Sequence, residues 1–218
     1  MRKIIPLLIV LMISKFSLAQ SLSKTGTKVE NIVPNGWVCS NVKGDLNKDG
    51  ISDLVIIATP NFEDKITIED DFTLKNSNPP ILAIYWGNSN KRYTLYKQYE
   101  NIIPFSEDQY SSVKVDLSVT NKGVLRIGIS YFQSAESFDN SSTAYLFRYQ
   151  NNDFYLIGEG SDSFARNTGD GKKITINYST LKRQIVLYNM FDESIPKEEK
   201  WETLPNQELK KLGSFKLE

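Results

Sequence analysis

The sequence predicts an all-β fold with little helix, arranged as an antiparallel meander of hairpins. First, apolar and polar residues alternate without interruption from Val113 to Val119, which is typical of a half-buried strand. Second, the turn Asn121–Gly123 leads into a second alternating run from Leu125 to Tyr131, as expected for a hairpin. Third, similar strand–turn–strand units begin near residues 81, 113, 143 and 172. This spacing fits a propeller-like array and an ordinary β-sandwich equally well, so both remain open.

Helix signals are scarce. The tail Pro205–Gly213 is the clearest candidate, because Gly213 could serve as the C-terminal stop of a short helix. We expect one or two helical turns there at most. No shift in composition marks a domain boundary, so residues 20–218 are predicted to form a single all-β domain.

The first residues are typical of a secretory signal peptide. Arg2 and Lys3 give a basic start, Ile4–Ile13 is apolar, and small residues precede a cleavage position near Ala19. Residues 1–19 are therefore predicted to be a signal peptide, which places the mature chain in the periplasm or outside the cell. No later segment is apolar for about 18 residues, so we expect no membrane span.

The composition excludes several classes of protein. The whole chain has 26 basic and 26 acidic residues, and loss of the signal peptide leaves 23 against 26, a net charge of −3. Such a balance argues against a nucleic-acid partner, which requires a basic surface. Histidine is absent, which removes serine and cysteine nucleophiles that depend on an imidazole base. Cys39 is the only cysteine, so no intramolecular disulfide forms, and we expect this thiol to be buried and inert.

An aromatic stripe on one predicted strand has two readings. Tyr145, Phe147 and Tyr149 alternate with other residues and therefore share one face. Such stripes usually pack in a core or against neighbouring strands, which is the reading we favour. The alternative is a platform on which a carbohydrate stacks.

One segment has the spacing of a calcium-binding loop. Side-chain oxygens occupy loop positions 1, 3, 5 and 9, which are Asp45, Asn47, Asp49 and Asp53. Gly50 occupies position 6, where a calcium loop turns sharply, and Ile51 at position 7 offers its backbone carbonyl. Calcium prefers six to eight oxygen ligands in flexible geometry. A tight polar turn without an ion is the alternative, but such a turn does not require the first and last aspartates.

The exit from this loop differs from that of an EF-hand. Position 12 is Ile56, where an EF-hand has a bidentate glutamate, and Leu54–Ile57 is a short apolar run typical of a buried strand. The site is therefore predicted to be a strand–loop–strand hairpin over about residues 37–58, with Asp53 closing the calcium shell.

The loop sequence from Asp45 to Asp53, preceded by Gly44 and followed by an aliphatic strand, resembles the D-x-N-x-D-G-x-x-D loop of FG-GAP/VCBS-type repeats. These repeats occur in integrin-like propellers and in many secreted bacterial proteins. The match covers about Gly44–Ala58. The resemblance implies a calcium-binding hairpin on an all-β domain.

These features together predict an exported calcium-binding domain without catalytic activity, which acts by binding a protein or glycan at the cell envelope or outside the cell. Two alternatives remain open. One is an exported inhibitor, immunity or adhesion protein in which calcium is purely structural. The other is a hydrolase that uses carboxylates such as Asp162 and Asp170.

Overall fold

The computed structural model describes residues 21–68, 74–106, 111–133, 138–194 and 196–218, so the signal peptide predicted at 1–19 lies outside the described residues. Regular structure in these ranges is β-strand apart from two short 3₁₀ helices, η1 (Val29–Asn31) and η2 (Glu63–Lys65). The all-β prediction is confirmed. Across the same ranges no helix has both the length and the apolar character needed to cross a membrane.

The strands form two large antiparallel sheets and one small one. The first sheet has five strands in the order β1-β7-β6-β3-β2. In chain order these are β1 (Thr25–Gly26), β2 (Val38–Gly44), β3 (Asp53–Thr59), β6 (Ile81–Gly87) and β7 (Tyr93–Glu100). A separate two-stranded ribbon consists of β4 (Ile66–Ile68) and β5 (Leu74–Asn76).

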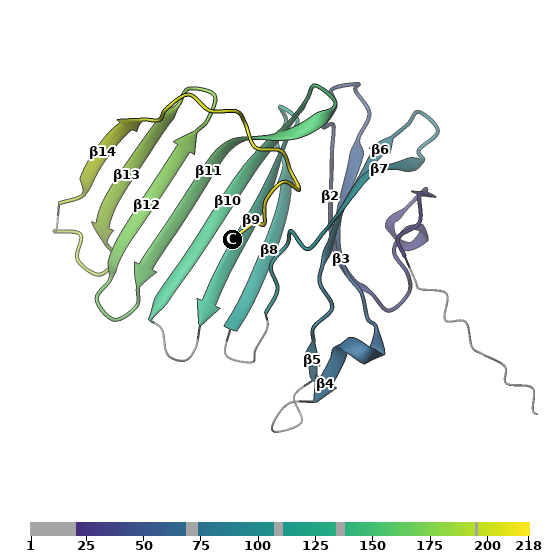
Figure 1. The fold of residues 1–218 in the computed structure, drawn as a ribbon, viewed down its shortest axis with the longest axis horizontal. Helices are drawn as coiled ribbons and strands as arrows, with labels where there is room; N and C mark the ends of the chain where they lie inside the picture. Colours follow the sequence, from purple (N-terminus) through teal and green to yellow (C-terminus); the bar gives the residue numbers. More distant parts are fainter. Residues whose placement is uncertain (1–20, 69–73, 107–110, 134–137, 195) are drawn as a thin grey trace, which may run out of the picture.

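The second sheet is a seven-stranded meander in which each strand pairs with its neighbours in sequence. Its strands are β8 (Ser111–Val119), β9 (Val124–Gln133), β10 (Asp139–Gln150), β11 (Asp153–Ala165), β12 (Asp170–Asn177), β13 (Lys182–Asn189) and β14 (Glu198–Thr203). Figure 1 shows these strands side by side in one curved sheet, with the five-stranded sheet beyond β8. The hairpins predicted near residues 81, 113, 143 and 172 are β6–β7, β8–β9, β10–β11 and β12–β13.

The main core lies between the two large sheets, which makes the arrangement sandwich-like. One face of β3 contributes Val55 and Ile57, and β9 contributes the alternating residues that the sequence predicted to be buried. The other face of β3 packs against the N-terminal segment through Leu54 and Ile56. Both faces of β3 are covered, which explains why it is apolar throughout, as expected for a fully buried strand.

The two sheets meet edge to edge at β2 and β8. A Cβ added to Gly44 would lie 2.4 Å from a methyl carbon of Val119, so only glycine allows this approach. The open end of the meander is β14, whose exposed glutamates and lysine are typical of a protected sheet edge.

The aromatic stripe belongs to the core, as the favoured reading predicted. Phe147 is fully buried and Tyr145 is 6% exposed. Tyr149 lies in an aromatic cluster with Trp86, and the two ring centroids are 4.9 Å apart. The platform for carbohydrate stacking is therefore not formed by these side chains.

The C-terminal tail is extended, so the prediction of helical turns at Pro205–Gly213 is wrong. Lys211 forms a β-bridge with Tyr155. On either side of it, the Leu212 N–H donates to the carbonyl of Phe154 and the Lys210 carbonyl accepts the N–H of Leu156. Leu212 is 2% exposed. Gly213 therefore follows an extended segment instead of ending a helix.

The prediction that Cys39 is buried is also wrong. The thiol is exposed because β2 is the outer strand of its sheet and Cys39 lies on it beside Val38, which is 71% exposed. The apolar neighbours in the sequence suggested a core position, but the core residue of this segment is Trp37.

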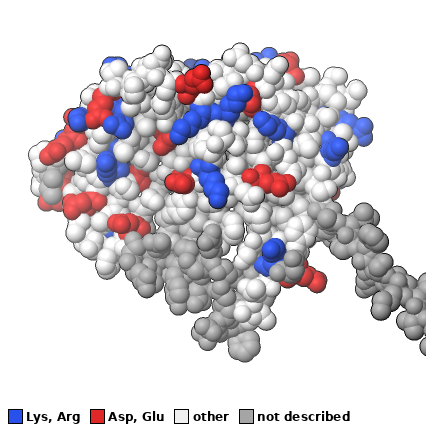
Figure 2. Space-filling view, viewed as in Figure 1, with Lys and Arg blue, Asp and Glu red and all other residues white. Residues whose placement is uncertain are grey.

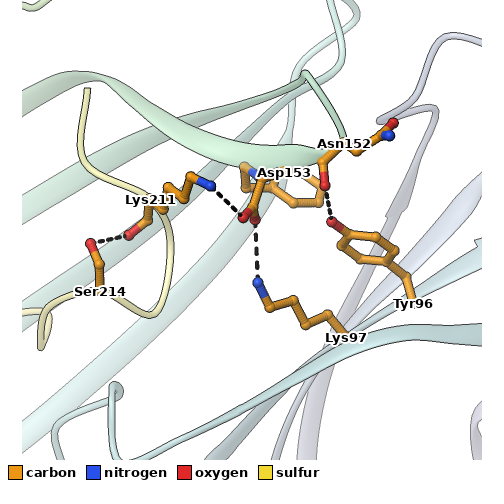
Figure 3. A network of polar contacts seen from close by, with 7 residues as sticks. Tyr96, Lys97, Asn152, Asp153, Lys211 and Ser214 are labelled. Atoms are coloured by element: carbon orange, nitrogen blue, oxygen red, sulfur yellow. Dashed lines mark hydrogen bonds and ion pairs between the residues drawn. The ribbon is translucent and has the colours of Figure 1, made fainter. Parts of the chain in front are cut away.

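Asp153 joins the two sheets and the tail. Its carboxylate lies 3.4 Å from the ammonium of Lys97 on β7 and 3.6 Å from that of Lys211 in the tail. The Tyr96 hydroxyl donates a hydrogen bond to the carbonyl of Asn152 at 2.8 Å. Figure 3 shows these groups converging on the turn between β10 and β11. Three segments far apart in sequence are thus tied at one point.

Candidate metal site

The predicted calcium loop connects β2 to β3 and lies where the two sheets meet. Leu46 anchors the loop to the core between the sheets, because its side chain is buried there and only 1% exposed. The β8–β9 turn packs closely on the loop: a Cβ on Gly123 would lie 2.7 Å from the carbonyl oxygen of Asp45. The loop is therefore in contact with both sheets.

Asp45 organises the first half of the loop. Its Oδ1 accepts hydrogen bonds from the N–H groups of Lys48 at 2.7 Å and Asp49 at 3.2 Å. Its Oδ2 accepts a third bond from the N–H of Gly50 at 2.9 Å. The carboxylate of Asp45 thus holds the next five residues in a turn by accepting three of their N–H groups, as aspartates commonly do.

Asn47 and Asp49 continue the same pattern. Asn47 Oδ1 accepts the N–H of Asp49 at 3.0 Å, and Asp49 Oδ1 accepts the N–H of Ile51 at 2.8 Å. The wrapping requires positive φ at Lys48 (64°) and Gly50 (83°). Glycine adopts this conformation freely, whereas a lysine is strained in it.

Asp53 is the buried base of the loop. Its side chain has no exposed surface, although most buried positions in the core are apolar. Oδ2 accepts the N–H of Leu46 at 2.8 Å, and Oδ1 accepts the N–H of Gly87 at 3.0 Å. The carboxylate therefore fastens the start of β3 both to the loop and to the end of β6.

Burial raises the pKa of the Asp53 carboxyl above its usual value of 3.8, because the charged form loses water. The hydrogen bonds from Gly87 and Leu46 lower this pKa, while the negative charge of Asp49 raises it. The net effect raises the pKa, so burial disfavours the charged form of Asp53, and the charge of Asp49 disfavours it further.

The donor chemistry of the loop fits calcium. All predicted ligands are oxygens: carboxylates at Asp45, Asp49 and Asp53, an amide at Asn47 and a carbonyl at Ile51. Among the described residues, none of these three carboxylates has an ion pair with a lysine or arginine.

In the structure, the side-chain oxygens of Asp45, Asn47 and Asp49 accept hydrogen bonds from N–H groups of the same loop. Within the described ranges no three acidic, histidine or cysteine side chains converge on one point that would hold a metal. The Nδ2 of Asn47 donates to Asp49 Oδ2 at 3.0 Å, so a donor group faces one of the predicted ligands. A bound ion would require this amide to rotate and Asp53 to share an oxygen that already accepts an N–H.

The structure adds two partners that sequence reasoning missed. Leu46 and Gly87 supply the N–H groups that hold Asp53. Gly87 lies 34 residues from Asp53 along the chain, and no local pattern signals that pairing. The burial of Leu46 was detectable in principle, since it is a large apolar side chain among mostly polar loop residues.

The carboxylates considered for hydrolysis belong to two separate networks. Asp162 Oδ1 accepts the hydroxyl of Tyr188 at 2.6 Å, and its Oδ2 lies 3.3 Å from Lys173. Asp170 instead accepts the amide of Asn189. Each acid thus has a structural partner within the outer half of the meander.

Comparison with protein-family models, with characterised proteins and with solved structures found no match for this chain. The assignment of function therefore depends on the chemistry of the loop itself.

Proposed function

We propose that this chain is an exported calcium-binding β domain without catalytic activity, which binds a partner at the cell envelope or outside the cell. Calcium is held by the side chains of Asp45, Asn47, Asp49 and Asp53 and by the carbonyl of Ile51. Calcium supplies a double positive charge that neutralises the crowded carboxylates.

The observation that supports calcium best is the wrapping of the loop around its acidic side chains. Residues 45, 47 and 49 each turn an oxygen back onto the N–H groups of residues 48–51. The backbone turn demanded by positions 1 to 7 of a calcium loop is therefore already formed. To bind the ion, the amide of Asn47 must rotate, and the three carboxylates, which already accept N–H groups, must share oxygens with it.

The position of the loop favours a structural role for the ion. Asp53 bonds to Gly87 on β6, and Gly123 of the β8–β9 turn packs on Asp45. An ion that fixes the loop also fixes the junction between the sheets. Calcium is therefore expected to stabilise the whole domain rather than only one hairpin.

Thermal unfolding with increasing calcium tests this proposal. Extracellular calcium modules bind at about 10⁻⁴–10⁻³ M, so about 5 mM calcium and a Kd of about 0.5 mM would add about 1.4 kcal/mol. For a domain of this size the melting temperature should rise by roughly 3–6 °C. Magnesium should have a much smaller effect, because it demands a tighter octahedral shell and keeps its water.

A matched pair of variants locates the effect. Asp49→Asn removes one charge from the loop but retains an oxygen for the N–H of Ile51, so it should lose the calcium-dependent shift. Asp170→Asn makes the same chemical change on β12, outside the loop, and should keep the shift. Equal shifts in both variants, or none in the wild-type protein, would leave the loop as a plain turn.

Export depends on the residues from Met1 to Ala19, and it has its own test. The mature protein recovered from the cell envelope or medium should begin at Gln20. Recovery of protein that still begins at Met1 would contradict it.

A further inference from the structure

We propose that a hollow beside the calcium loop binds a small molecule with two or more oxyanion groups, whether phosphates, sulfates or carboxylates. The hollow has a volume of about 750 Å³, within the usual range of small-molecule sites. It goes beyond the calcium site, although Asp45 and Lys48 belong to both.

Three cationic side chains from three separate segments line this hollow. Lys48 comes from the β2–β3 loop, Lys122 from the β8–β9 turn and Arg148 from β10. Over the ranges that the structure describes, no ion pair, side-chain hydrogen bond or aromatic contact engages any of these three charges. Among the described residues, no acidic side chain neutralises these three charges, which line the same hollow.

Among the residues that the structure describes, Asp45 is the only acidic one that lines the hollow. Both of its carboxylate oxygens already accept N–H groups inside the loop. One carboxylate therefore stands against three cationic side chains in the lining. The balance of charge at the hollow is accordingly positive.

Neutral groups in the lining add hydrogen-bond donors. The Thr120 hydroxyl oxygen accepts the N–H groups of Lys122 and Val124, at 3.3 and 3.2 Å. Both of its acceptor positions are thus occupied, and its proton is available to a ligand. Asn121 is exposed at the rim and offers an amide.

The hollow is lined by three basic residues and one acidic residue among those that the structure describes. On the face drawn in Figure 2, lysine and arginine side chains are interspersed with aspartate and glutamate. Several charged residues of the protein are paired, as Arg183 is with Glu202 and Lys173 with Asp162. Because the hollow is open to water, binding should be weak and should decrease as salt screens the charges.

The test is calorimetric titration of the purified protein with pyrophosphate and with citrate, which distinguish phosphate from carboxylate recognition. Calcium is first removed on a chelating resin, because both probes bind calcium themselves. This condition also makes the result independent of the calcium proposal. We expect saturable binding of one equivalent of at least one probe, weaker binding of inorganic phosphate, and none of glucose.

Variants then assign the site. Surface charge pairs contribute up to about 1 kcal/mol each, so Lys122→Gln and Arg148→Gln should each weaken binding about threefold, and together about tenfold. Lys114→Gln removes an exposed charge from the outer face of β8 and should leave binding unchanged. Since Lys122 is exposed, its replacement does not threaten folding. Absence of saturable binding up to about 10 mM of either probe, or an equal loss in the Lys114 control, would overturn the proposal.

Discussion

Replacing Asp53 with alanine should destabilise the protein strongly even in the absence of calcium. The carboxylate has no exposed surface and accepts the N–H groups of Leu46 and Gly87, at 2.8 and 3.0 Å. Alanine would leave both donors without a partner. The two N–H groups belong to the loop and to β6, so both connections of β3 would weaken together.

The magnitude follows from the cost of unsatisfied buried donors, which is about 1–3 kcal/mol each. Two donors give about 2–6 kcal/mol. Removal of a carboxylate whose charge is disfavoured by burial offsets part of this loss. We therefore expect a net loss of about 3 kcal/mol, or roughly 6–12 °C in melting temperature.

The assay is urea unfolding in calcium-free buffer, followed by tryptophan fluorescence, to which buried Trp37 contributes. Asp49→Ala is the matched control, because that aspartate is exposed and its removal should cost under about 1 kcal/mol. If Asp53→Ala lies within about 0.5 kcal/mol of wild type, the reasoning about its two hydrogen bonds is wrong.

Three further predictions concern the rest of the fold. Burial raises the pKa of Tyr85 from 10.0 to about 12, so its neutral form stabilises the fold up to pH 10. As pH rises from 10 towards 12 the unfolded chain ionises first, and Tyr85 alone should account for a loss of up to about 3 kcal/mol, measured by circular dichroism beside phenolate absorbance. Asp153→Asn removes two ion pairs with partly exposed lysines and should lower the free energy of unfolding in urea by about 1 kcal/mol. An unchanged free energy of unfolding would show that these pairs do not stabilise the fold. Leu212→Ala should cost about 3 kcal/mol in the same assay, because the side chain is 2% exposed, whereas Leu187→Ala, at 42% exposure, should cost far less.

Most of the strand architecture was predictable because the buried faces follow a strict period of two. Val113–Val119 and Leu125–Tyr131 alternate because one face of the meander covers the core and the other meets water. Leu54–Ile57 lacks alternation for the opposite reason, since both of its faces are covered. The pattern does not say which hairpins share a sheet, so the choice between propeller and sandwich needed the structure.

The sequence-based predictions were wrong where the position of a residue in the fold, rather than the local sequence pattern, decides its structure or burial. Gly213 suggested the stop of a short helix, yet Lys211 bridges to Tyr155 on β11, so the chain is extended. Cys39 has apolar neighbours but lies on an outer strand. At the candidate site, the ligand spacing was visible in sequence, whereas the bond from Gly87 to Asp53 and the approach of Arg148 depend on residues many positions away.

The central claim, that the loop from Asp45 to Asp53 holds calcium, is tested most directly by calorimetric titration of calcium into metal-free protein. The account predicts one ion per chain with a Kd of about 10⁻⁴–10⁻³ M, no comparable heat with magnesium, loss of binding in Asp49→Asn and retention in Asp170→Asn. No calcium-dependent heat in the wild-type protein at several millimolar calcium, or binding that survives Asp49→Asn unchanged, would contradict it.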